Sequence, residues 1–147
     1  MERTAGGALI DNVLVFVVPS AAPEIGRVRR AVSEFLTLRG VPSVVVEDMQ
    51  LVASELATNA VMYGVGESIE VQVTMDDDIR MAVSNEGDAS LIPTVDAWGP
   101  APAMAISGRG LGIVRRLADE VAVQGRDGRA TVVVWRRLPD GRPDWAV

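Results

Sequence analysis

The segment from residue 44 to residue 63 constrains the fold of this chain more than any other, because it carries two separate stripes at helical spacing. One stripe is apolar and predicts a buried helix face; its members are Val45, Met49, Val52, Leu56, Ala60 and Tyr63. The other stripe is polar, since Glu55 and Asn59 are four residues apart and therefore lie one above the other on a different face. Ser43 predicts the start of this helix and Gly64 its end.

A glycine-rich run stands further along the chain, Gly108-Arg109-Gly110-Leu111-Gly112. Backbone amides in such a run can close over a phosphate group, and the helix predicted at residues 111–118 would point its N-terminus at the same anion. Glu55 and Asn59 could converge on that phosphate through a bound metal ion. The two segments together predict a nucleotide site, although a polar pair at this spacing is, taken alone, more often a solvated helix face.

The other periodicities predict one further helix and a sheet. Apolar residues recur at helical spacing over residues 23–38, and strands are expected at 13–18, 69–75, 79–83, 121–123 and 131–135. About twenty small and Pro-rich residues precede Gly108, which is typical of a lid or a disordered loop. Within them, Trp98 could pack on a nucleotide, on a partner or simply as a hydrophobic anchor.

Absent residue types exclude several kinds of site. The chain has no His and no Cys, which removes Ser-His-Asp and Cys-His nucleophile systems, imidazole or thiolate metal sites and disulfides. All 14 basic residues are Arg, so a Walker phosphate loop and the protein-kinase fold lack their lysine. Ile113 replaces the third glycine of a dinucleotide-binding motif. A histidine kinase that phosphorylates itself in cis is excluded as well.

Charge and hydropathy indicate where the protein acts. A formal charge of −6 disfavours general binding to nucleic acid or to anionic membranes. No stretch approaches the roughly twenty apolar residues that span a bilayer, and the N-terminal apolar stretch is interrupted by Asp11 and Asn12, unlike a signal peptide. We therefore expect a cytoplasmic protein with no direct contact to nucleic acid or membrane.

Four stretches, in order and spacing, resemble the ATP-binding domain of the GHKL superfamily, which includes sensor histidine kinases and DNA gyrase. They are residues 51–64, 83–87, 108–114 and 128–134, and the resemblance covers roughly residues 10–138. The closer likeness is to the bacterial anti-sigma factor and serine kinase branch. We expect a two-layer α/β sandwich, with a mixed, largely antiparallel sheet of about five strands covered on one face by about three helices. A single domain is expected over residues 1–147, with its core at about 10–138, a flexible ATP lid at about 86–107 and a tail at 139–147.

The resemblance implies a role for each site residue. Asn59 would ligate a Mg²⁺ ion that bridges the phosphates of ATP, and Glu55 would act as the general base. The phosphates would be wrapped by the run Gly108, Arg109, Gly110, Leu111 and Gly112. At the adenine end, Gly87 would let the backbone approach the base, and Thr131 would support the base pocket.

Two positions depart from the family pattern. Asn85 stands where the family usually has an Asp that reads adenine. A carboxamide can still accept a hydrogen bond from the adenine amino group, but it loses the charge-assisted part of that bond. Asn85 could equally be a plain turn residue at a strand end. Tyr63 stands where this branch usually has His, which indicates variation at the helix end and not loss of the chemistry.

The function implied by the resemblance is that of an anti-sigma factor. It would hold a sigma factor and use MgATP to phosphorylate a serine or threonine of an anti-sigma antagonist, and it could form a homodimer. One alternative is an ATP-responsive protein-binding module without kinase activity, for which Asn85 is the best argument. A less favoured alternative is an orphan histidine-kinase-like domain that acts in trans.

Overall fold

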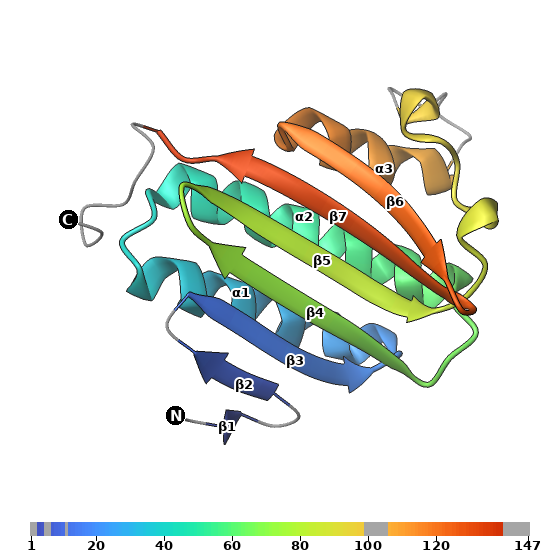
Figure 1. Cartoon of the computed structure of the whole chain (residues 1–147), viewed down its shortest axis with the longest axis horizontal. Coiled ribbons are helices and arrows are strands. Elements are labelled where there is room, and N and C mark those ends of the chain that lie inside the picture. The colour runs from blue at the N-terminus through green and yellow to red at the C-terminus, as the bar shows by residue number, and fades with distance from the viewer. Residues whose placement is uncertain (1–2, 5–6, 11, 99–105, 140–147) are drawn as a thin grey trace.

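Three helices cover one face of an antiparallel sheet in the computed structural model of the chain (Figure 1), which describes residues 3–4, 7–10, 12–98 and 106–139. The helices are α1 (Ile25–Leu38), α2 (Ser43–Tyr63) and α3 (Ile106–Leu117). The strands are β1 (Arg3–Thr4), β2 (Gly7–Ile10), β3 (Val13–Pro19), β4 (Ser68–Met75), β5 (Asp78–Glu86), β6 (Glu120–Arg126) and β7 (Arg129–Arg137). Three single turns of 3-10 helix complete the fold: η1 (Ala22–Glu24), η2 (Ala89–Leu91) and η3 (Val95–Ala97).

The predicted two-layer sandwich is confirmed. The strand order is β1-β2-β3-β4-β5-β7-β6, and the five strands expected from the sequence are its last five. Two short N-terminal strands, β1 and β2, extend this sheet beyond β3. The sheet was expected to be mixed, but every described strand pair is antiparallel, because short hairpin connections join most neighbouring strands.

The core lies between the sheet and the helix layer, and the alternation of each strand decides which residues enter it. On β4, the buried residues are Ile69, Val71, Val73 and Met75. On α2, five of the six residues of the predicted apolar stripe are buried. The exception is Tyr63, which is 48% exposed because it lies in the last turn of the helix, where a pocket opens.

Two segments differ from the sequence-based expectation. The helix α3 begins at Ile106 and not at Leu111, so the glycine-rich run forms its first turns instead of a preceding loop. The Pro-rich segment contains η2 and η3 within residues 88–98, where no stable element was expected. Within the described ranges, no helix combines the length and the apolar character needed to cross a membrane.

Candidate functional site

The polar stripe of α2 faces the first turns of α3. Glu55 and Asn59 are both half-buried. A Cβ atom added at Gly110 would overlap the Glu55 carboxylate, so this carboxylate lies directly against the backbone of the glycine-rich run. The structure therefore brings together the two segments that the sequence linked only by motif. Glycine at position 110 is what permits this close approach.

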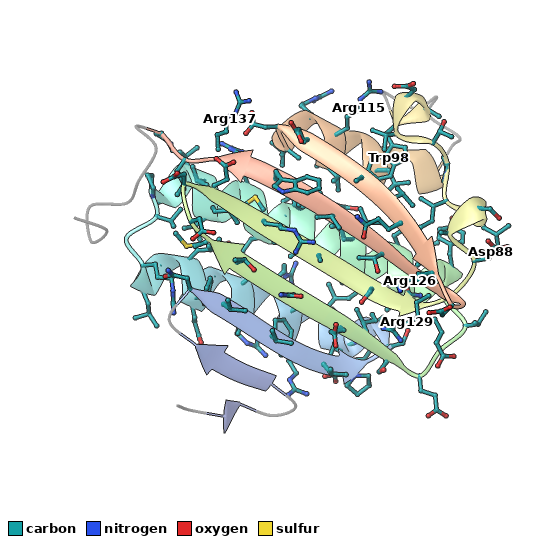
Figure 2. All side chains as sticks on the ribbon, viewed as in Figure 1. Asp88, Trp98, Arg115, Arg126, Arg129 and Arg137 are labelled. Atoms are coloured by element: carbon teal, nitrogen blue, oxygen red, sulfur yellow. The ribbon has the colours of Figure 1, made fainter. Side chains whose placement is uncertain are left out.

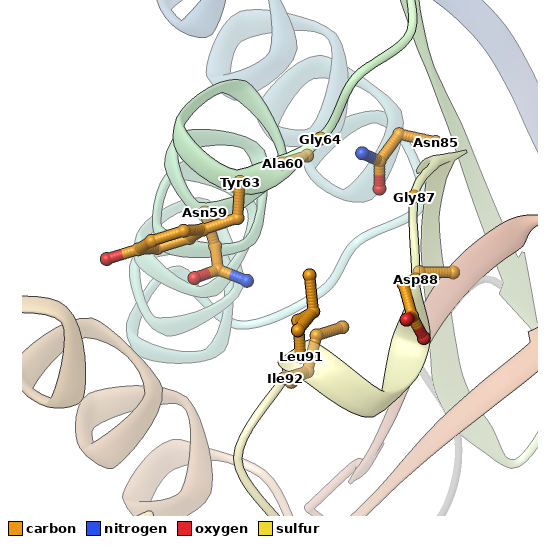
Figure 3. Close-up of a pocket in the computed structure, with 10 residues that line it drawn as sticks. Asn59, Ala60, Tyr63, Gly64, Asn85, Gly87, Asp88, Leu91 and Ile92 are labelled. Carbon is orange, nitrogen blue, oxygen red and sulfur yellow. The ribbon is translucent and has the colours of Figure 1, made fainter.

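A pocket opens between the C-terminal turns of α2, the end of β5 and the segment that follows β5 (Figure 3). It contains about 280 Å³ of empty space, part of which is open to solvent. The residues that line it are Asn59, Ala60, Tyr63, Gly64, Asn85, Gly87, Asp88, Leu91, Ile92 and Ala130. The pocket thus joins the predicted metal ligand at one end to the predicted adenine-reading turn at the other.

Asn85 is the buried polar residue of this pocket, with 9% of its surface exposed. Its Nδ2 atom donates a hydrogen bond of 3.0 Å to the carbonyl oxygen of Glu86. A flipped carboxamide would place two acceptors against each other, so this bond fixes the orientation of the side chain. The Oδ1 atom is then the acceptor that remains for a ligand, and it points into the space beside Gly87 (Figure 3).

Gly64 packs against the carboxamide of Asn85. A Cβ atom at Gly64 would overlap the Nδ2 atom of Asn85 and would lie 2.5 Å from the carbonyl oxygen of Ala60. The φ angle of Gly64 is −77°, which any residue can adopt. Glycine is therefore required at this position by close packing and not by the left-handed conformation in which many helices end.

A second cavity continues from Asn59 to α3. It contains about 380 Å³ of empty space, part of which is open to solvent, and is lined by Asn59, Tyr63, Leu91, Ile92, Pro93 and Leu111. Four residues line both cavities, namely Asn59, Tyr63, Leu91 and Ile92. The two cavities therefore form one groove that runs from Asn85 to the first turns of α3.

Thr131 does not enter this groove. In the antiparallel register, Asn85 pairs with Ala130 and Ser84 pairs with Thr131. Paired residues share a face of the sheet, so Ala130 faces the pocket with Asn85 while Thr131 faces the side without helices. The structure therefore places Ala130, and not Thr131, on the face that lines the pocket, whereas Thr131 was predicted to support a bound base.

The other predicted residues lie along the groove or at its end. Gly87 lines the pocket, and its amide donates a 2.9 Å hydrogen bond to the carbonyl oxygen of Gly128. Leu111 lines the second cavity, and Gly112 follows it within α3. Gly108 and Arg109 lie in the first turns of α3, but the side chain of Arg109 is outside the described part of the structure.

Sequence reasoning missed the wall of the groove formed by Asp88, Leu91 and Ile92. Asp88 precedes η2 and accepts hydrogen bonds from the hydroxyl (2.6 Å) and the amide (2.9 Å) of Ser90. The bond from the Ser90 hydroxyl, and to a smaller extent the bond from its amide, lower the pKa of the Asp88 carboxyl below its ordinary value. The sequence signal available was an Asp-x-Ser cap followed by two apolar residues in an otherwise small and Pro-rich loop.

The donor set of the groove fits a magnesium-bound nucleotide. The carboxamide of Asn59 lines the groove and supplies an oxygen ligand of the kind that Mg²⁺ prefers, and the carboxylate of Glu55 lies one turn away on the same stretch of α2, against the glycine-rich run. The Oδ1 atom of Asn85 is an acceptor that suits the amino group of adenine, and Leu91 and Ile92 offer apolar contacts to a flat base.

Comparisons with known proteins agree with this geometry. Residues 18–135 match the family model of the histidine kinase-like ATPase domain. No curated protein matches the chain. The crystal structure of the RsbU and RsbW domains of Rv1364c from Mycobacterium tuberculosis is similar with a TM-score of 0.63 and 20% identity. That match covers 87% of this chain but 33% of the other, so the chain spans about a third of its length.

A second solved structure is similar over most of both chains. The SiaB-SiaC complex from Pseudomonas aeruginosa matches with a TM-score of 0.62 and 17% identity, over 83% of this chain and 88% of that one. At these identities the likeness establishes a shared fold.

Proposed function

The chain belongs to the histidine kinase-like ATPase domain family, which implies an ATP site, and from that premise we propose that it binds MgATP in the groove between α2, the segment after β5 and α3. We further propose that it transfers the γ-phosphoryl group to a serine or threonine of a partner protein. The observation that carries the proposal is the groove that joins Asn85 and Asn59 to the first turns of α3, which bear the glycine-rich run.

The two ends of the groove differ in chemistry, which supports one orientation of the nucleotide. Its Asn85 end offers the Oδ1 acceptor of that residue and a close backbone at Gly87, which suits adenine. Its α3 end offers the backbone of a helix N-terminus, which suits phosphate groups. Asn59 lies between the two ends and would hold Mg²⁺, which supplies charge neutralisation for the phosphates when it is bound.

Glu55 would accept the proton of the acceptor hydroxyl group. In the proposed reaction the acceptor hydroxyl oxygen forms a bond to the γ-phosphorus, and the bond from the γ-phosphorus to the β,γ-bridging oxygen breaks. The hydroxyl proton passes to the Glu55 carboxylate, and ADP leaves with the electron pair of the broken bond. Arg109 and the free amides of the first turn of α3 would stabilise the charge on the transferred group.

For the partner we propose an anti-sigma antagonist as phosphoryl acceptor and a sigma factor as the protein that is held. This assignment rests on the resemblance in sequence and on fold neighbours named as an RsbW domain and a SiaB-SiaC complex. A lid at residues 86–107, a homodimer and a cytoplasmic location belong to the same proposal.

One observation favours the second candidate, a nucleotide-responsive binding module without kinase activity. The Glu55 carboxylate packs against Gly110 in this conformation, so an acceptor hydroxyl would need the first turns of α3 to move before it could reach the carboxylate. If ATP moves these turns without an acceptor, the same site would change the shape of a partner surface and transfer nothing.

Calorimetric titration with ATP, in the presence and absence of Mg²⁺, tests whether the groove binds MgATP. We expect binding that depends on Mg²⁺ in the wild type and is lost in Asn59→Ala. Met62→Ala is the matched control, because Met62 lies on the same helix, is 55% exposed and does not line either cavity. Absence of binding by the wild type at millimolar ATP would contradict both candidates.

Release of phosphate from γ-labelled ATP separates the two candidates. A kinase site transfers the phosphoryl group slowly to water, and Glu55→Gln should remove that turnover while ATP affinity stays within about threefold of the wild type. Binding of ATP without any turnover by the wild type would leave the binding module as the function, whereas equal turnover in the wild type and Glu55→Gln would exclude Glu55 as the general base.

A further inference from the structure

Residues 88–98 form one wall of the groove, although little in their sequence holds them in shape. Their regular structure consists of the single turns η2 and η3. Such a segment keeps its position only if contacts from elsewhere in the fold hold it. Two contacts at its far end do so, one made by Trp98 and one by Arg115 (Figure 2).

Trp98 is the first contact. It is 1% exposed and belongs to the main hydrophobic core. Its indole Nε1 donates a 2.8 Å hydrogen bond to the carbonyl oxygen of Pro93, which closes residues 93–98 into a loop. Pro93 itself lines the cavity beside Asn59, so the buried ring is linked directly to the wall of the groove.

Arg115 is the second contact. Its Nη1 atom donates to the carbonyl oxygens of Val95 (3.0 Å), Asp96 (3.1 Å) and Trp98 (3.3 Å). These carbonyls lie at the C-terminal end of η3, where a helical turn favours a cation, and that of Val95 also accepts a hydrogen bond from the Trp98 amide. The Nη2 atom lies 3.7 Å from the carboxylate of Asp96, whose side chain is fully exposed, so the carbonyl bonds carry this contact.

The position of Arg115 links the wall to the helix that bears the glycine-rich run. Leu111 and Arg115 are four residues apart on α3 and therefore share a face. Leu111 lines the groove, while Arg115 holds residues 95–98. A displacement of α3 by bound phosphate groups would thus be passed to the wall through one side chain.

We propose that Arg115 is a positioning residue for the nucleotide groove: it holds the wall at residues 92–98 against α3 and couples this wall to nucleotide bound at the glycine-rich run. The coupling part rests on the proposed function, whereas the holding part concerns the nucleotide-free protein alone. Arg115 does not touch the reacting atoms in this arrangement, and its effect on ATP passes through Ile92 and Pro93.

Hydrogen exchange measured by mass spectrometry on nucleotide-free protein tests the holding part. The amides of Ala97 and Trp98 donate within η3, to Thr94 and Val95. We expect Arg115→Ala to speed their exchange about tenfold, whereas Arg116→Ala, the neighbouring exposed arginine on α3, should leave it unchanged. Equal exchange in the two variants would overturn the proposal.

ATP titration of the same proteins tests the coupling part. We expect Arg115→Ala to weaken ATP binding about tenfold and Arg115→Lys to recover part of that loss, since lysine keeps the charge and the donors but has a shorter side chain and a more strongly hydrated ammonium group. MgATP should slow exchange at residues 92–98 in the wild type and not in Arg115→Ala. Weaker ATP binding with unchanged exchange at this wall would overturn the proposal.

Two further results keep the outcome interpretable. Val32→Ala, which opens the core on α1 away from α3 and from this wall, should lower global stability and keep wild-type ATP affinity; loss of affinity in that variant would mean that any destabilisation has the same effect, which would overturn the role of Arg115. If Arg115→Ala does not fold, Arg115→Lys decides by the same two measurements. If the wild type binds no ATP, the proposed function fails, while exchange in the nucleotide-free variants still decides whether Arg115 holds the wall.

Discussion

The contact between Gly110 and Glu55 makes an unusual prediction about a glycine inside a helix. Replacing glycine by alanine in a helix interior normally stabilises a protein by about 1 kcal/mol. At Gly110 the new methyl group would overlap the Glu55 carboxylate and lie 3.3 Å from its Cδ atom. Overpacking of this kind costs about 1–3 kcal/mol, at the low end here because the overlapped atom ends a flexible side chain. Gly110→Ala should therefore change stability little, or lower it by about 1 kcal/mol.

A double-mutant cycle isolates this effect. In a Glu55→Ala background the carboxylate is gone and the remaining neighbour, the Glu55 Cβ atom, lies at an ordinary 3.7 Å from the new methyl group. Gly110→Ala should then show the full helix gain of about 1 kcal/mol. The expected coupling between the two substitutions is about 1–2 kcal/mol, measured by urea unfolding of the wild type, the two single variants and the double variant.

The same substitution has a functional consequence, because the carboxylate that it displaces is the proposed general base. Gly110→Ala should reduce phosphate release from ATP by at least about tenfold. The reasoning is refuted if Gly110→Ala stabilises the wild type and the Glu55→Ala background by the same amount, because the carboxylate would then not lie against this helix.

Three other perturbations test separate parts of the structure. Gly64→Ala should destabilise the protein by about 2–3 kcal/mol and impair ATP binding, since the methyl group overlaps the Asn85 carboxamide; unfolding and calorimetry would check this, and a wild-type stability would contradict it. Arg136→Met removes two hydrogen bonds of 2.8 Å, one to Asp48 and one to the carbonyl oxygen of Leu117 at the end of α3. Because the Arg136 and Asp48 side chains are only 20% and 25% exposed, the substitution should lower the free energy of unfolding by about 2 kcal/mol and Tm by about 4–8 °C. An unchanged Tm would exclude a stabilising role for Arg136. The pKa of Asp88 is lowered on folding, so the stability that its carboxylate contributes is complete above its ordinary pKa of about 3.9 and is lost only as pH falls through the lower folded value. Hydrogen exchange of the Ser90 amide, corrected for the intrinsic pH dependence of exchange, should therefore show constant protection from about pH 5 to 8. A fall in protection within that range would show that Asp88 does not cap this turn.

Local patterns in the sequence predicted most of the fold. The apolar stripe of α2 and the alternation of β4, β5 and β7 predicted these elements to within a few residues at their ends. The juxtaposition of Glu55 and Asn59 was predictable for the same reason, because residues four apart on a helix are neighbours whatever the rest of the chain does.

The sequence did not reveal the reason for two glycines. Gly64 was predicted as a helix stop, and Gly110 as part of a glycine-rich run whose backbone amides close over a phosphate. In the structure each is required because a side chain from a distant part of the chain, Asn85 or Glu55, lies against its Cα atom. Close approach of this kind depends on how elements pack, which no local pattern records.

By itself, the sequence determined which elements form and which polar residues share a face of α2, because helical and strand periods are properties of neighbouring residues. Only the tertiary structure decided that Ala130, not Thr131, faces the pocket, because a shift of one residue in strand register exchanges the two faces of a sheet. It also decided that residues 88–98 form a wall, since the contacts of Trp98 and Arg115 that hold them join segments 17–20 residues apart and others more distant still. Such contacts form only when the whole chain has folded.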